Sequence, residues 1–154
     1  MTSFQNILVP VDFGDATQAG IDLAISLAQK FDAKLTLVTA FDITPFMVTT
    51  AFAPPIDAEP TIEALERALA DLVATVRKTW PKTESAFGHG APQEVILSTA
   101  AARNCDLIVI GSRGRHGISR ALLGSTAEKV VRFSPIPVLT VHPRPGVATT
   151  ATAA

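Results

Sequence analysis

Residues 7–41 read ILVPVDFGDATQAGIDLAISLAQKFDAKLTLVTAF and contain a complete strand-helix-strand unit. The apolar run at 7–11 is short and nearly continuous, which is typical of a strand buried on both faces of a parallel sheet. Residues 15–31 repeat apolar side chains at helical spacing, and residues 34–41 are rich in β-forming side chains. We therefore predict the first two strands of a parallel sheet with a helix between them.

Strands and helices continue to alternate along the rest of the chain. We predict further strands at residues 83–87, 106–111 and 137–141, and further helices at 62–80, 92–104 and 125–133. This alternation predicts a parallel sheet with right-handed crossovers and helices on both faces, which is a doubly wound α/β fold. We expect five strands in the order 3-2-1-4-5 and four helices. We expect a single domain over 1–142 and a flexible tail at 143–154, while the proline-rich loop at 42–60 has no assigned role.

The composition is that of a globular protein. Hydrophobic residues make up 47% and charged residues 18% of the chain, which excludes the polar, highly charged balance of disordered proteins. The net charge of -1 argues against nucleic-acid binding, because phosphate-backbone binders usually carry a basic excess.

No signal-peptide pattern and no apolar stretch of about 18 residues is found, so no membrane span is expected. Since Cys105 is the single cysteine, no internal disulfide can form, and we expect a cytoplasmic location.

The loops after the first and fourth strands are the expected ligand site. Open parallel sheets bind ligands at the carboxyl ends of their strands, where the strand order reverses. The first loop carries Asp12, and the second begins with Gly111 and Gly114, whose missing Cβ lets the backbone approach a ligand. Three arginines and no acidic residue follow before Gly124. Gly124 opens the helix at 125–133, whose free N–H groups attract phosphate, so this segment predicts an anion site.

The same residues also allow a structural interpretation. Ser125 and Glu128 form an S-x-x-E capping pattern, and the glycines can be ordinary loop residues. The chain lacks G-x-x-x-x-G-K-[ST], and no G-x-G-x-x-G follows its first strand, which argues against a P-loop ATPase and an NAD-dependent dehydrogenase. The three histidines have no metal-ligand spacing. We interpret Cys105 and Trp80 as core side chains.

The segment at 111–141, GSRGRHGISRALLGSTAEKVVRFSPIPVLTV, resembles the universal stress protein family. The ATP-binding members of that family carry G-x2-G-x9-G-[ST], and the corresponding residues here are Gly111, Gly114, Gly124 and Ser125. The stretches ILVPVDFG, GAPQEVI and CDLIVIG extend the resemblance over residues 4–142. The chain departs from the family where Phe13-Gly14 follows Asp12, because small residues and serine are common there and a hydroxyl contact from position 14 is lost.

The resemblance implies an adenine-nucleotide α-hydrolase-like fold that binds ATP, or another adenine nucleotide, together with Mg²⁺. The adenosine end would be contacted by Pro10, Val11 and Asp12, with Asp12 near the ribose or base. The adenine would be walled by Val38, Thr39 and Ala40. The ribose and phosphates would be received by Gly111, Arg113 and Gly114. The phosphate chain would be held by Gly124, Ser125 and Thr126.

The resemblance further implies a nucleotide-dependent regulatory or signalling protein of the stress response, whose occupancy changes a surface that an unknown partner recognises. A nucleotide-free interaction module and a slow ATP hydrolase remain open as alternatives. Efficient hydrolysis needs a positioned base, and the sequence reveals none clearly. The strand at Pro137–Val141 would leave an apolar sheet edge exposed, so the pattern and the resemblance both predict a homodimer through it.

Overall fold

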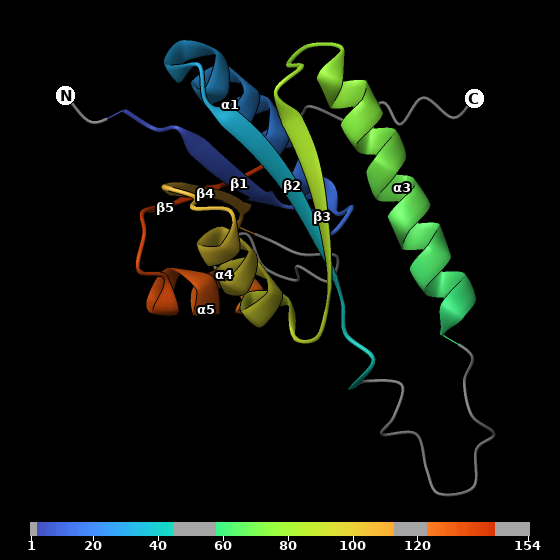
Figure 1. Cartoon of the computed structure of the whole chain (residues 1–154). Coiled ribbons are helices and arrows are strands. Elements are labelled where there is room, and N and C mark those ends of the chain that lie inside the picture. Colours follow the sequence, from blue (N-terminus) through green and yellow to red (C-terminus); the bar gives the residue numbers. More distant parts are fainter. Residues whose placement is uncertain (1–2, 45–57, 113–122, 144–154) are drawn as a thin grey trace, which may run out of the picture.

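Five parallel strands form one sheet in the order β3-β2-β1-β4-β5 in the computed structural model, which describes residues 3–44, 58–112 and 123–143 (Figure 1). The strands are β1 (Asn6–Pro10), β2 (Lys34–Phe41), β3 (Thr83–His89), β4 (Leu107–Gly111) and β5 (Val138–Val141). The helices are α1 (Asp15–Phe31), α3 (Glu59–Arg77), α4 (Pro92–Ala102) and α5 (Ser125–Phe133). The predicted strand order and the four helices are confirmed, whereas the tail and most of the proline-rich loop fall outside the described residues.

Two helices cover each face of the sheet. Alternate residues of a strand point to opposite faces, so each strand contributes side chains to both core clusters. Val9 of β1 and Leu37 of β2 belong to the core cluster formed with α1 and α3. Leu8 and Val38, one residue before or after them, belong to the cluster formed with α4 and α5. In β1 and β2, odd-numbered residues therefore face α1 and α3, and even-numbered residues face α4 and α5.

Helix α3 begins and ends earlier than the apolar pattern predicts, at Glu59–Arg77 in place of 62–80. Pro60 lies in its first turn, where a backbone N–H would have no helical partner. Trp80 lies beyond the helix, and its indole Nε1–H donates to the carbonyl oxygen of Ala33 over 2.9 Å. Trp80 packs against the core as expected, but it does so from the loop after α3. The predicted end of the helix at residue 80 is therefore three residues too late. No helix in the described ranges is long and apolar enough to cross a membrane.

Cys105 is a buried core side chain, as its position before a buried strand predicts. Burial disfavours the thiolate and raises the pKa of Cys105 to about 11, and the neighbouring Asp106 carboxylate adds to this rise. A thiol that stays protonated at neutral pH is a poor nucleophile. Cys105 therefore does not supply the chemistry of a functional site.

Candidate functional site

A cavity of about 800 Å³ opens at the carboxyl ends of β1, β2 and β4, where the strand order reverses. Its volume is typical of small-molecule sites. Among the residues that the sequence singles out, its walls contain Pro10, Val11, Asp12, Val38, Thr39, Ala40, Gly111, Gly124, Ser125 and Thr126. Arg113 and Gly114 lie outside the described residues. The fold thus brings two distant loops and the end of β2 around one space, and the binding role of these residues stays a prediction.

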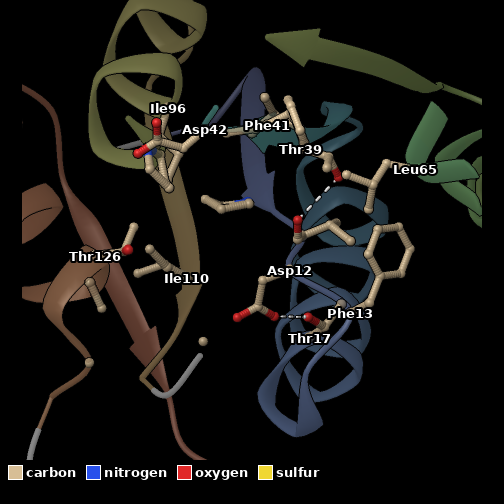
Figure 2. A pocket seen from close by; sticks show the side chains of 18 of the residues that line it. Asp12, Phe13, Thr17, Thr39, Phe41, Asp42, Leu65, Ile96, Ile110 and Thr126 are labelled. Carbon is tan, nitrogen blue, oxygen red and sulfur yellow. Dashed lines mark hydrogen bonds between the residues drawn. The ribbon is translucent and has the colours of Figure 1, made fainter. Parts of the chain in front are cut away.

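The cavity is one continuous space whose walls come from both sides of the end of β1. Figure 2 shows Asp42, Ile96, Ile110 and Thr126 on one side of the end of β1, and Phe13, Thr39 and Leu65 on the other. We call the part of the cavity beside α4 and α5 the α5-side chamber; these two helices contribute Pro92, Ile96, Ser125, Thr126 and Ala127 to its wall. We call the part of the cavity beside α3 the α3-side chamber; this helix contributes Thr61, Ala64, Leu65 and Ala68 to its wall. Because side chains alternate along β2, this strand contributes residues to both sides of the cavity.

Asp12 holds the turn between β1 and α1. Its Oδ1 accepts hydrogen bonds from the backbone N–H of Gly14 over 2.9 Å and from the hydroxyl of Thr17 over 2.8 Å. These bonds secure Phe13 in the left-handed backbone region, with φ of 58°, which non-glycine residues rarely adopt. Figure 2 shows the other carboxylate oxygen directed away from Thr17, toward the open cavity. Asp12 therefore combines a structural role with one oxygen that a ligand can reach.

Gly111 is required by helix packing and not by a left-handed backbone. A Cβ at position 111 would lie 2.7 Å from the Cβ of Ala16 and 3.2 Å from its backbone carbonyl carbon and oxygen. Among the described glycines, Gly90 alone has a positive φ, so the conformational freedom expected of Gly111 is not used. The first glycine of the motif lets α1 approach the end of β4, which sets the depth of the cavity beside Asp12.

The two ends of the glycine-rich loop are tied together at the cavity. The backbone N–H of Gly124 donates to the carbonyl oxygen of Ser112 over 2.6 Å, and the N–H of Ser112 donates to Val141 of β5 over 2.8 Å. Gly124 is the N-cap of α5, and this cap has no side-chain hydrogen bond. The capping-box interpretation of Ser125 is therefore wrong, because Ser125 is already the first helical residue and lies exposed at the chamber wall.

Some wall residues are missing from the sequence prediction. Asp42 follows β2 as Asp12 follows β1, and this position at a strand end could have identified it. The side chain and the backbone N–H of Thr44 hydrogen-bond to Asp42 and lower the pKa of its carboxyl group, which keeps it ionised. Ile96 of α4 also lines the cavity. The α3 residues of the α3-side chamber could not be predicted, since they depend on the angle at which α3 leaves the sheet.

The acidic groups of the cavity are few. Asp12 and Asp42 are the titratable side chains among the described residues that line it. The described ranges also contain no group of three or more His, Cys, Asp or Glu side chains placed to hold a metal ion. A metal in this cavity would need most of its ligands from a bound molecule and from water.

The chain is similar to universal stress proteins over nearly its whole length. A family model described as the universal stress protein family matches residues 3–142. A universal stress protein of Methanocaldococcus jannaschii is 30% identical over 139 residues, covering 90% of this chain and 82% of that protein. The solved structure of the universal stress protein UspA from Lactobacillus plantarum gives a TM-score of 0.73 at 28% identity, covering 92% of this chain and 99% of that chain. A universal stress protein solved in complex with cAMP gives a TM-score of 0.70 at 25% identity, covering 93% of this chain and 100% of that chain.

Proposed function

Because this chain belongs to the universal stress protein family, we propose that it binds ATP or another adenine nucleotide in the α5-side chamber and acts as a nucleotide-dependent regulator. The main support for this proposal is the position of the α5 N-terminus, since Gly124, Ser125 and Thr126 line the same cavity as Asp12. A helix N-terminus and a strand-end carboxylate around one cavity suit the phosphate and nucleoside ends of a nucleotide. The cAMP complex of a similar protein supports this class of ligand.

The phosphates of the proposed ligand would lie against the first turn of α5. The first backbone hydrogen bond of this helix runs from the N–H of Glu128 to the carbonyl oxygen of Gly124. The N–H groups of the three residues between them have no partner within the helix, as in any first turn. The hydroxyls of Ser125 and Thr126 add two donors, and the helix dipole adds a partial positive charge. This arrangement favours an anion without requiring a lysine or arginine from the described residues.

The adenine would lie in the notch left where β1 ends before β2. The last pair of these strands is Pro10 with Val38, and the N–H of Val11 still donates to the carbonyl oxygen of Val38 over 2.8 Å. Backbone groups two residues apart in a strand point to the same side, so those of Ala40 also point toward β1. Because the chain turns away at Asp12, the N–H and carbonyl of Ala40 face the cavity. The N–H of Ala40 can donate to N1 of adenine, and its carbonyl oxygen can accept a hydrogen bond from the 6-amino group.

Regulation by occupancy suits this site better than rapid hydrolysis. Asp12 and Asp42 lie at the nucleoside end, and one oxygen of Asp12 is already bonded to Gly14 and Thr17. Neither carboxylate is placed as a base beside phosphates at the α5 N-terminus. Mg²⁺ would bind with phosphate oxygens and water, which it prefers as ligands. We accordingly propose that an unknown partner in the cytoplasm recognises the nucleotide-bound form during the stress response.

Calorimetric titration of the purified full chain with MgATP tests this function. We expect saturable binding to one site per chain and markedly weaker binding of GTP, whose 6-oxo group does not match the carbonyl of Ala40. The double variant Gly114→Val with Ser125→Ala should remain folded and lose ATP binding. A folded, nucleotide-free wild type that binds neither nucleotide would favour the interaction-module alternative, and steady release of ADP would favour the hydrolase.

A homodimer through β5 is the second part of the proposal. This strand is at one edge of the sheet, so its outer backbone groups have no strand partner in the described structure. Leu139 is 38% exposed, whereas Val138 and Val141 are partly buried against the two core clusters. An apolar side chain on an open edge favours pairing with a second copy. Leu139 is therefore a better test of this interface than the two valines.

Replacing Leu139 with lysine should convert a dimer into monomers. The substitution removes the apolar contact between the two copies of Leu139 and places two positive charges close together at the interface. The mass of the wild type and of Leu139→Lys can be compared by multi-angle light scattering at several concentrations. Thr75→Lys, which places the same charge on an exposed position of α3, serves as the control and should leave the mass unchanged. A monomeric wild type, or a dimer that survives Leu139→Lys, would refute an interface at β5.

A further inference from the structure

Asp42 is a cavity residue whose role the proposed function leaves open. It directly follows the last residue of β2, and it lines the cavity together with Ala40, two residues earlier. Figure 2 shows Asp42 on the same side of the end of β1 as Thr126, which is the side proposed for the nucleotide. A carboxylate therefore lies at the end of the site where the base is proposed to bind.

The Asp42 carboxylate is held in place and stays ionised. The side chain of Thr44 hydrogen-bonds to it, and the backbone N–H of Thr44 donates to its Oδ1 over 2.9 Å. Both bonds lower the pKa of the Asp42 carboxyl group. None of the salt bridges within the described residues includes Asp42. An ionised carboxylate accepts about four hydrogen bonds and donates none, so Asp42 has acceptor capacity left for a donor on a ligand.

In the proposed adenine position, the 6-amino group is turned toward Asp42. The N–H of Ala40 precedes its carbonyl along β2, so the amino group at this carbonyl is the part of the base nearer to the carboxyl end of the strand. One amino hydrogen is used by the carbonyl of Ala40, and the other, on the N7 side of the ring, points farther along the chain. Asp42 lies about 7 Å beyond Ala40 at the usual rise of a strand, which brings this hydrogen within reach of its side chain.

We propose that Asp42 accepts the second hydrogen of the 6-amino group and thereby selects 6-aminopurine nucleotides over 6-oxopurine nucleotides. This inference rests on the proposed function, because it assigns a role within the same site. A 6-oxo group would bring an oxygen atom against the Asp42 carboxylate with no proton between them, which is repulsive. Asp42 thus adds a penalty against the wrong base to the hydrogen bonds that the backbone of Ala40 offers.

Titration calorimetry of the full chain with three nucleotides tests this role. ATP carries the amino group, purine riboside triphosphate lacks it but keeps N1 as an acceptor, and inosine triphosphate has an oxygen in its place. We expect the wild type to bind ATP more tightly than both. Asp42→Asn should lower the preference for ATP over purine riboside triphosphate by about tenfold or more, as expected for a hydrogen bond to a charged group. Its amide N–H₂ can donate to a 6-oxo group, so inosine triphosphate should bind more tightly to this variant than to the wild type.

Asp71→Asn is the matched control, since it removes the same charge from an exposed position of α3 away from the cavity walls. Its preferences among the three nucleotides should equal those of the wild type. Purine riboside triphosphate offers no amino group to Asp42, so its saturable binding to Asp42→Asn would show that this variant keeps its fold and its site.

The outcomes separate this inference from the proposed function. Saturable ATP binding with equal preferences in Asp42→Asn and the wild type would refute the role of Asp42 and leave the proposed function standing. The same holds if the wild type does not distinguish ATP from purine riboside triphosphate. A variant that loses both of these nucleotides equally would show that Asp42 is structural and does not select the base. A wild type that binds none of the three would refute both proposals.

Discussion

Ser125→Glu is expected to lower the affinity for MgATP about a hundredfold while leaving the protein at least as stable as the wild type. The two effects have opposite signs for one reason. A carboxylate in the first turn of α5 interacts favourably with the helix dipole and stabilises the fold by about 0.3 to 1 kcal/mol. The same carboxylate would occupy the position proposed for the phosphates and would repel them. Ser125 is exposed, so the longer side chain meets no packing penalty.

Calorimetry for affinity and urea unfolding for stability check this prediction together. Ser98→Glu places the same charge on an exposed position of α4 away from the cavity walls and should bind MgATP as the wild type does. Unchanged affinity in Ser125→Glu would place the phosphates elsewhere and remove the observation on which the proposed function rests. A large loss of stability would instead show that Ser125 has a structural role that its uncapped, exposed position does not indicate.

The strands, the helices and the two site-forming loops could be predicted because they follow from local patterns. Buried parallel strands appear as short apolar runs, and helices repeat their apolar residues at a spacing of about 3.6. Asp12 and Gly124 could be placed near each other because both follow from the rule that ligands bind at the reversal of strand order. Asp42 obeys the same rule at the end of β2, so it too could have been predicted from the sequence.

Features set by contacts between distant segments could not be predicted. The apolar stripe of α3 predicts a buried face along the whole helix, but only the C-terminal half is buried, because the helix diverges from the sheet. A loop glycine is equally compatible with a left-handed backbone, a bound ligand or close packing. Only the approach of Ala16 to Gly111 decides among these, and no local pattern encodes the separation of α1 from the end of β4.

Gly111→Ala should destabilise the protein by about 2 to 3 kcal/mol, a large effect for one methyl group. The new Cβ would lie 2.7 Å from the Cβ of Ala16 and 3.2 Å from its backbone, so α1 must move away from β4. Urea unfolding measures the loss. Gly20→Ala is the matched control in α1, because its Cβ would have the N atom of Gly111 as its nearest neighbour at 3.9 Å. This control should be tolerated, or should stabilise the helix by up to about 1 kcal/mol.

A double-mutant cycle identifies the contact responsible. Ala16→Gly removes the methyl group that the new Cβ would meet, so Ala16→Gly with Gly111→Ala should be more stable than the two single variants predict by addition. The expected coupling is about 1 kcal/mol, within the range for residues in direct contact. Strict additivity would mean that Gly111 is needed for a reason other than Ala16. A wild-type stability in Gly111→Ala alone would mean that α1 can move without cost, and the depth of the cavity beside Asp12 would then not be fixed by this glycine.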